Sequence, residues 1–241
     1  MKPFELIPFG GLTYIVRFLS LEQNREDILW LHRWATVLRE QDNGHFETVL
    51  VSHLDVNLVL KKPMNQAELE NIIENALEQF AHQAPEGPKV LWEIPACFEP
   101  DFAPDLYDYF EGDYDKAASY IKDFTDQSLF VYFFGFLPGF AYLGGLLPEL
   151  QMPRKDHPRL EVPKGALGVG GSYAAVYPQK SPGGWQLIGQ TPFIFFDIRR
   201  KSPFFLQPGE LVRFMAIDVK EYGTLVEAYE AAPFLPKKIE M

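Results

Sequence analysis

Residues 181–192 run Ser-Pro-Gly-Gly-Trp-Gln-Leu-Ile-Gly-Gln-Thr-Pro, and residues 134–144 run Phe-Gly-Phe-Leu-Pro-Gly-Phe-Ala-Tyr-Leu-Gly. In both stretches, Pro and Gly stand directly beside a short run of residues that favours β-structure. Gly lets a backbone approach a ligand or a neighbour closely, and Pro stiffens the loop that carries it. The segment 134–192 therefore predicts rigid strand ends that either surround a pocket or simply make turns in a packed wall.

The residues around these two motifs predict a β barrel in the C-terminal part of the chain. The dense apolar run at 128–136 predicts a buried strand. Short runs of β type follow between Gly and Pro residues, at 168–170, 174–177, 186–188, 193–198 and 210–217. Strands at this spacing are typical of a closed or nearly closed barrel, which also hides its strand edges.

The first third of the chain predicts an alternation of strands and helices. Strands are expected at 11–18, 46–51, 56–60 and 89–94. One helix is expected after the N-cap Asn24, and another after Asn65, with an apolar stripe at helical spacing. The order β-α-β-β-α-β is the ferredoxin-like arrangement, in which both helices cover one face of the sheet. We expect a second domain or a partner to cover the other face.

Composition and charge narrow the functional classes. The 241 residues carry a formal net charge of −11, which disfavours binding to nucleic acid. There is neither a signal peptide nor an apolar run long enough to span a membrane, so we expect a cytoplasmic protein. The single cysteine, Cys97, could act as a nucleophile, but its apolar neighbours favour a buried strand position.

Arg154 and Arg159 lie between the two motifs and are candidate ligand-binding residues. Arginine binds a carboxylate through two parallel hydrogen bonds. Pairing of both arginines with internal acids is an equally good interpretation. The acidic stretch 105–115 could suggest a calcium loop, but it lacks the EF-hand spacing and is better explained by two short helices.

The common catalytic motifs are incomplete in this sequence. No Walker loop, nucleophile elbow or Cys/His zinc set is present, and we predict no metal site. The fragment Gly168-Val-Gly170 lacks the strand–helix context of a dinucleotide site. An incomplete catalytic set favours a subunit or a binding protein over a self-sufficient enzyme.

The motifs as a group resemble a known family. Residues 134–144, Pro153-Arg154, residues 158–163, Tyr177-Pro178 and residues 181–192 resemble the family that contains the B subunit of 5-oxoprolinase. That family also includes the Kip-type inhibitor of a sporulation histidine kinase and allophanate hydrolase subunit 1. The resemblance implies an α+β fold, with a ferredoxin-like α/β domain at 1–88 and a cyclophilin-like β barrel at 89–241.

The resemblance also implies a function and its partners. The chain would act with a larger barrel subunit and a third hydrolase subunit to convert 5-oxoproline, ATP and water to glutamate, ADP and phosphate, with ATP bound at the level of the complex. The expected substrate-binding residues are Arg154, Arg159, Gly139, Tyr142, Tyr177, Gly183, Gly184, Trp185 and Thr191. Two alternatives remain: a regulator that binds and inhibits a sensor histidine kinase and, suggested by the barrel alone, a peptidyl-prolyl isomerase.

The sequence departs from the family pattern beside the Tyr177-Pro178 motif. Tyr173-Ala174-Ala175 stand where Gln-Thr-Gly is common. If the usual Gln-Thr pair lines the substrate pocket, its replacement would alter the substrate or the activity.

Overall fold

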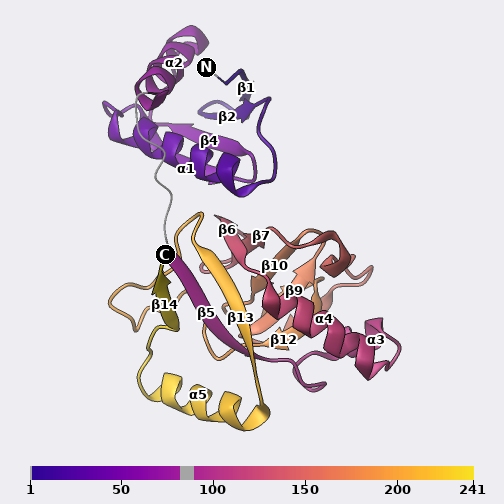
Figure 1. Cartoon of the computed structure of the whole chain (residues 1–241). Coiled ribbons are helices and arrows are strands. Elements are labelled where there is room, and N and C mark those ends of the chain that lie inside the picture. Colours follow the sequence, from indigo (N-terminus) through magenta and orange to yellow (C-terminus); the bar gives the residue numbers. More distant parts are fainter. Residues whose placement is uncertain (1, 82–89) are drawn as a thin grey trace. The chain divides into compact units, whose positions relative to one another are not determined.

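The computed structural model describes residues 2–81 and 90–241, which are drawn in colour in Figure 1. The chain divides into two units, Met1–Gly87 and Pro88–Met241. Each unit has a hydrophobic core of its own. The predicted domain boundary, between residues 88 and 89, lies outside the described residues.

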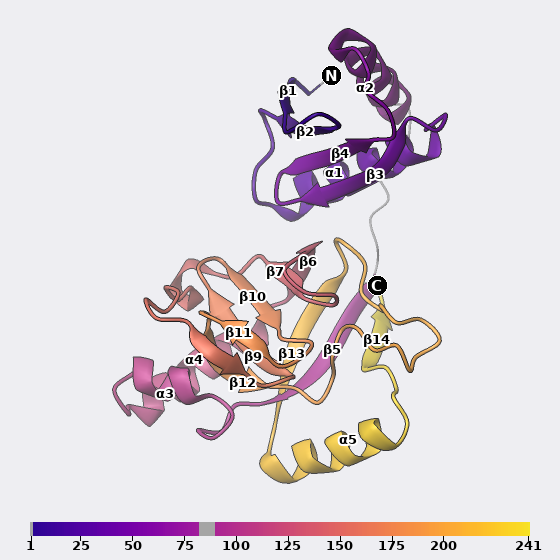
Figure 2. The same ribbon diagram turned by 180° about the vertical axis from the view of Figure 1, so that it is seen from behind.

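The first unit consists of a four-stranded antiparallel sheet and two helices (Figure 2). Its strands β1 (Phe4–Pro8), β2 (Thr13–Phe18), β4 (Asp55–Leu60) and β3 (Phe46–Ser52) lie side by side in that order. Helices α1 (Arg25–Glu40) and α2 (Gln66–Ala81) pack against the apolar face of the sheet. Asn24 caps α1 as predicted, because its side chain accepts the backbone N–H of Asp27 at 2.9 Å.

The predicted ferredoxin-like order is wrong in its fourth strand. Strand β5 (Val90–Cys97) belongs to the second unit, where it pairs in parallel with β13 (Leu211–Ile217). The first sheet takes β1 instead, a strand that the sequence analysis missed. No residue of β1 is fully buried, which suits a sheet edge, whereas β5 is largely buried on both faces, which suits a barrel strand.

The second unit is built around a closed barrel, as predicted. Seven strands form the ring β12-β9-β10-β7-β6-β13-β5, and β12 pairs with β5 to close it. The strands introduced here are β6 (Leu129–Phe134), β7 (Ala141–Gly144), β9 (Ala166–Gly170), β10 (Tyr173–Val176) and β12 (Gln186–Gln190). Strand β14 (Lys237–Glu240) pairs with β5 beside the ring, and β8 (Arg159–Val162) pairs with β11 (Ser181–Gly183) as a separate ribbon.

Helices cover the outside of the barrel (Figure 1). The acidic stretch forms the two predicted helices, α3 (Pro104–Tyr109), which contacts β12, and α4 (Tyr114–Asp126), which contacts β13. Asp113 caps α4 by accepting the backbone N–H of Lys116 at 3.0 Å. A short 3-10 turn, η1 (Pro148–Leu150), and helix α5 (Val219–Ala231) complete the unit, and neither was predicted from the sequence.

The predicted strand at 193–198 is absent from the structure. This segment makes a single isolated bridge, from Phe196 to Phe204. Phe193, Ile194 and Phe195 are all buried, but the segment pairs with none of the barrel strands. Arg200 satisfies the backbone instead by donating to the carbonyl oxygen of Ile194 at 3.0 Å.

An ion pair between the half-exposed Arg199 and the buried Asp197 anchors the end of this segment. The guanidinium of Arg199 donates to the carboxylate of Asp197 at 2.8 Å, and the hydroxyl of Tyr229 in α5 donates to it at 3.1 Å. The hydrogen bonds from Arg199 hold the pKa of Asp197 well below its ordinary value, although burial opposes them. The pair therefore ties this irregular segment to α5.

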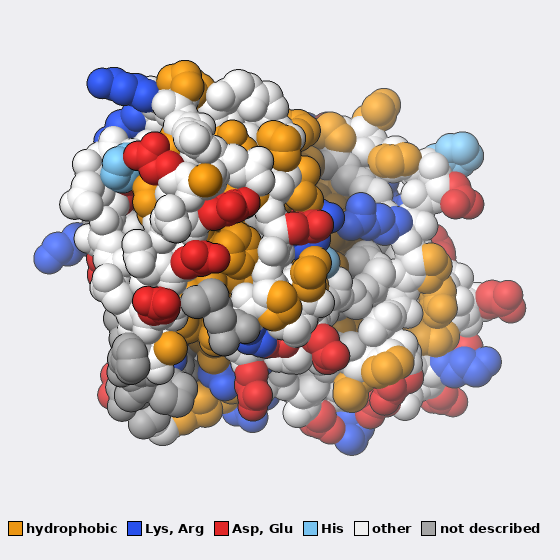
Figure 3. Space-filling model, turned by 90° about the horizontal axis from the view of Figure 1, so that it is seen from above, with side chains coloured by type: hydrophobic (Ala, Val, Ile, Leu, Met, Phe, Trp, Pro, Cys, Tyr) orange, Lys and Arg blue, Asp and Glu red, His pale blue; other side chains and the backbone are white. Residues whose placement is uncertain are grey.

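The molecular surface is mixed in character. On the face drawn in Figure 3, acidic and basic side chains are interspersed with hydrophobic ones. Among the described residues, no helix has the length and apolar character needed to cross a membrane.

Candidate functional site

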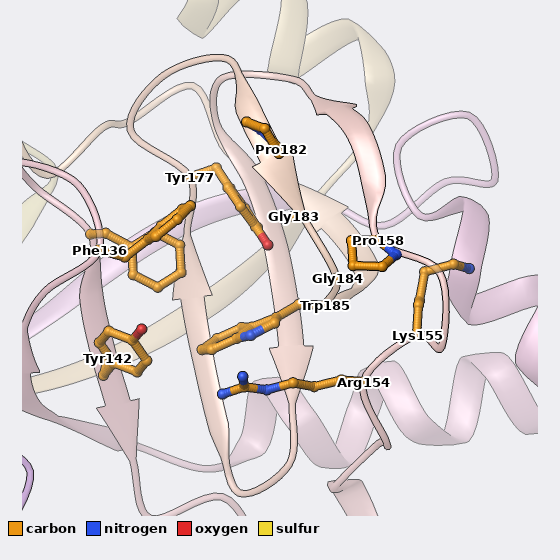
Figure 4. A pocket seen from close by; sticks show the side chains of 11 residues that line it. Phe136, Tyr142, Arg154, Lys155, Pro158, Tyr177, Pro182, Gly183, Gly184 and Trp185 are labelled. Carbon is orange, nitrogen blue, oxygen red and sulfur yellow. The ribbon is translucent and has the colours of Figure 1, made fainter.

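The candidate site is a pocket in the second unit, at the edge of the barrel and the β8–β11 ribbon (Figure 4). Its volume is about 380 Å³, which suits a small molecule. The residues that line it are Phe136, Phe140, Tyr142, Arg154, Lys155, Pro158, Tyr177, Pro182, Gly183, Gly184 and Trp185. The wall thus combines five aromatic rings with prolines and glycines, and two cationic residues lie on one side.

Glycines make room for the aromatic wall. A Cβ on Gly170 in β9 would lie 2.6 Å from Cγ of Trp185, so the indole can rest on this strand only beside a glycine. A Cβ on Gly183 would overlap the hydroxyl of Tyr177. The Gly168-Val-Gly170 fragment therefore accommodates aromatic rings and does not form a dinucleotide-binding turn.

Arg154 lies over the indole ring of Trp185. Its Cζ is 5.6 Å from the ring centroid, within the range of a cation–π contact. The backbone on both sides of Arg154 is held, because Gln186 Nε2 donates to the Pro153 carbonyl at 2.9 Å and the N–H of Lys155 donates to the Gly184 carbonyl at 2.7 Å. Among the described residues Arg154 has no ion-pair partner, so its guanidinium is available to an anionic ligand.

Lys155 and Arg159 are held by one buried carboxylate, that of Asp105 in α3. Asp105 is 1% exposed and accepts from Lys155 Nζ at 2.7 Å and from both terminal nitrogens of Arg159 at 2.6 Å. It also accepts the backbone N–H of Leu187 at 2.7 Å. Burial raises the pKa of Asp105, but these hydrogen bonds outweigh it and hold the pKa below its ordinary value. Asp105 thus remains ionised and ties two segments of the pocket wall together.

The two pocket tyrosines are neutral hydrogen-bonding groups. Burial raises the pKa of Tyr177 to about 12, although the backbone N–H of Trp185 donates to its hydroxyl and acts against this rise. Burial also raises the pKa of Tyr142, and the nearby positive charge of Arg154 opposes the change. Both phenols keep their protons at neutral pH and can donate to an oxygen atom of a ligand.

Phe136 stands at the rim of the pocket with a strained backbone. Its φ angle is 64°, a left-handed conformation that is unusual for a bulky side chain. The ring is 59% exposed and makes an edge contact with Phe140. Strained residues concentrate at functional sites, and here the strain places an aromatic ring at the pocket entrance.

The structure brings together six of the nine predicted site residues: Tyr142, Arg154, Tyr177, Gly183, Gly184 and Trp185 all line the pocket. The other three do not line it. Arg159 is bound to Asp105, which is the internal pairing that the sequence left open. Gly139 has a φ of 85° and lies against Phe196, so closely that a Cβ at this position would overlap that residue. Thr191 is buried, and its hydroxyl accepts the N–H of Phe193 at 3.1 Å.

Sequence reasoning missed Asp105 as part of the site. Its position near the start of a short helix indicates only a favourable interaction with the helix dipole. Its partners Lys155 and Arg159 lie 50 and 54 residues away, so no local pattern connects them. The departure at Tyr173-Ala174 lies beside the pocket and does not line it; the ring of Tyr173 makes an edge contact with that of Tyr142.

Comparison with known proteins places the chain in a family. A model of the carboxyltransferase domain, subdomain C and D, matches residues 5–206. The B subunit of 5-oxoprolinase from Bacillus subtilis is 36% identical over 155 residues, which make up 64% of this chain and 64% of that protein. The B subunit of 5-oxoprolinase from Escherichia coli is 33% identical over 187 residues, which make up 76% of this chain and 83% of that protein.

A solved structure shares the fold. The urea amidolyase of K. lactis matches 100% of this chain and 16% of its own length, with a TM-score of 0.79 and 18% identity. Because the domain model spans most of the sequence, and because the E. coli relative is matched over more than two thirds of its length, this chain belongs to the family of 5-oxoprolinase B subunits, whose fold is that of carboxyltransferase subdomains C and D.

Proposed function

We propose that the chain is one subunit of an ATP-dependent 5-oxoprolinase-type amidohydrolase and that its pocket binds the cyclic amide acid. The observation that carries this proposal is Arg154, which has no ion-pair partner in the described part of the chain, in a pocket that five aromatic rings line. Arginine would bind the carboxylate of 5-oxoproline through two hydrogen bonds, and the flat faces of Trp185 and Tyr142 would pack against its ring. The phenol of Tyr177 would donate to the amide oxygen.

The composition of the wall supports a subunit that needs a partner. None of the eleven lining residues is a carboxylate, a histidine, a cysteine or a serine. Hydrolysis of an amide requires a group that activates water and a group that stabilises the leaving nitrogen. The pocket can bind and orient a substrate, and a larger barrel subunit and a third hydrolase subunit would supply the remaining groups.

The pocket does not suit a nucleoside triphosphate. A triphosphate and its magnesium ion call for several cations and for carboxylate ligands. Here Arg154 is the only lining cation that is not already paired, and among residues 2–81 and 90–241 no group of three or more His, Cys, Asp or Glu residues is placed to hold a metal ion. In this proposal ATP is bound elsewhere in the complex and phosphorylates the amide oxygen to activate the ring.

Reconstitution tests the proposal. The chain is purified with the neighbouring subunits of its own host, and glutamate release from 5-oxoproline is measured with and without ATP. We expect ATP-dependent release that requires this chain and that falls at least about tenfold in the Arg154→Met variant. Absence of turnover with all subunits present would contradict the proposal, and inhibition of a host histidine kinase by the same preparation would favour the regulatory alternative.

A further inference from the structure

The loop from Arg154 to Arg159 carries three cationic side chains, yet only one of them is free to meet a ligand. Lys155 and Arg159 both bind Asp105, and among the described residues Arg154 makes no ion pair. In Figure 4 the guanidinium of Arg154 lies beside the Trp185 ring, whereas the amine of Lys155 is turned away from the aromatic wall.

We propose that Asp105 is a specificity-determining residue: by holding Lys155 and Arg159, it leaves Arg154 as the one cation that meets the ligand and so selects singly charged anions. This inference rests on the proposed function only in taking the pocket to be a carboxylate site. It concerns how many negative charges the ligand carries, and it holds whichever cyclic acid is the substrate.

Burial and geometry support this assignment. Asp105 is 1% exposed, so its charge is compensated by the groups that contact it and not by solvent. Its four short hydrogen bonds leave it no capacity for a ligand, and it lies on α3, outside the residues that line the pocket. It therefore acts on the ligand only through the cations that it holds.

Lys155 is the residue through which the selectivity would change. Its side chain is 29% exposed and it contributes to the pocket lining, so an unrestrained amine could swing into the cavity. Arg159 contributes nothing to the lining. The Asp105→Asn variant would keep an oxygen to accept the N–H of Leu187 but would lose the charge that retains Lys155. A second cation in the pocket would then favour a second negative charge on the ligand.

The experiment compares two probes with the same ring. Isothermal titration of the full-length chain measures the Kd of cyclopentanecarboxylate, a monoanion, and of cyclopentane-1,3-dicarboxylate, a dianion. We expect the wild-type chain to prefer the monoanion. The Asp105→Asn variant should shift the Kd ratio toward the dianion by about tenfold or more. The double variant Asp105→Asn/Lys155→Met should restore the wild-type ratio, and a merely structural function of Asp105 predicts no such restoration.

The single variant Lys155→Met provides a test that does not depend on the folding of the Asp105 variant. Asp105 keeps Arg159 and the N–H of Leu187 as partners in this variant, so the fold should persist. We expect the ratio of the two Kd values to stay within about twofold of wild type, because Asp105 holds the amine of Lys155 away from the ligand and the loss of its lining stem affects both probes alike. A ratio shifted about tenfold against the dianion would show that Lys155 is a ligand-binding cation and would overturn the inference.

The remaining outcomes separate the two proposals. A wild-type chain that binds the monoanion, together with an Asp105→Asn variant that folds with an unchanged ratio, would refute the selectivity inference alone. A wild-type chain that binds neither probe would refute the anion pocket itself, and with it both proposals. Thermal unfolding of each variant establishes that the proteins compared are folded.

Discussion

Arg154 and Arg159 lie five positions apart, in a loop and at the start of β8, and the structure predicts opposite consequences when each is replaced by methionine. Arg154 is exposed at the pocket and has no ion pair within the part of the chain that the structure describes. Arg159 is bound to the buried carboxylate of Asp105. The first substitution should therefore weaken ligand binding with little effect on stability, and the second should destabilise the fold.

The magnitudes follow from the contacts. Arg154→Met loses a cation–π contact at an exposed site, so the free energy of unfolding should fall by about 1 kcal/mol or less. A charge-assisted hydrogen bond to a ligand carboxylate contributes about 1.5–3 kcal/mol, so the Kd for 5-oxoproline should rise about 10- to 150-fold.

Arg159→Met removes two charge-assisted hydrogen bonds from Asp105. Lys155 and the N–H of Leu187 remain as partners, so the loss of about 2–3 kcal/mol is smaller than the 3–5 kcal/mol that follows when a buried pair is broken completely. For a unit of this size the melting temperature should fall by about 4–12 °C.

Both variants are measured by the same two assays, thermal unfolding of the full chain and titration with 5-oxoproline. The methionine substitutions are matched in size and in lost charge, so a nonspecific effect of net charge would appear in both. The reasoning is refuted if Arg154→Met leaves the Kd unchanged, or if Arg159→Met unfolds at the wild-type temperature.

Three further predictions test other parts of the second unit. Gly170→Ala places a methyl group 2.6 Å from the indole of Trp185, so it should destabilise the protein by about 1–3 kcal/mol and change the tryptophan fluorescence. The control Gly11→Ala meets no atom within 4 Å and should leave stability unchanged or raise it by up to about 1 kcal/mol. The pKa of Asp197 is lowered in the folded state, so its contribution is complete above the unfolded-state pKa of about 4 and is lost as the pH falls below it. In urea unfolding, the stability difference between wild type and Asp197→Asn should therefore shrink below about pH 4, and a difference that grows there would contradict the assignment. Burial raises the pKa of Tyr177 to about 12, so ligand affinity should stay level between about pH 6 and pH 9, and a titration step in that range would show that another group controls binding.

Local patterns in the sequence predicted the elements whose structure depends on nearby residues. Helix α1 begins at the expected cap because Asn24 satisfies a backbone N–H within its own first turn. The apolar stripe of α2 and the buried run of β6 were equally apparent, because periodicity reports which face of an element is covered. The glycine and proline motifs indicated where the pocket wall would lie, since close approach of aromatic rings requires residues without a Cβ.

Partnerships between distant segments could not be predicted in this way. The residues that were predicted to form the fourth strand of the first sheet form β5 of the barrel instead. Only their pairing with β13, more than a hundred residues later, assigns them to the barrel. The segment 193–198 has the composition of a strand, but the hydroxyl of Thr191 accepts the N–H of Phe193 and Arg200 donates to the Ile194 carbonyl, so these backbone groups need no partner strand.

In the candidate site, too, local sequence patterns predicted some features and only contacts between distant segments decided others. From the sequence alone, Arg154 and Arg159 were equivalent candidates for binding an anion, because both have the same side chain in the same loop. The tertiary structure distinguishes them by bringing the buried carboxylate of Asp105 against one and leaving the other over Trp185. A charge in a folded protein is available only if no opposite charge has already been placed beside it, and that placement depends on contacts between segments far apart in the chain.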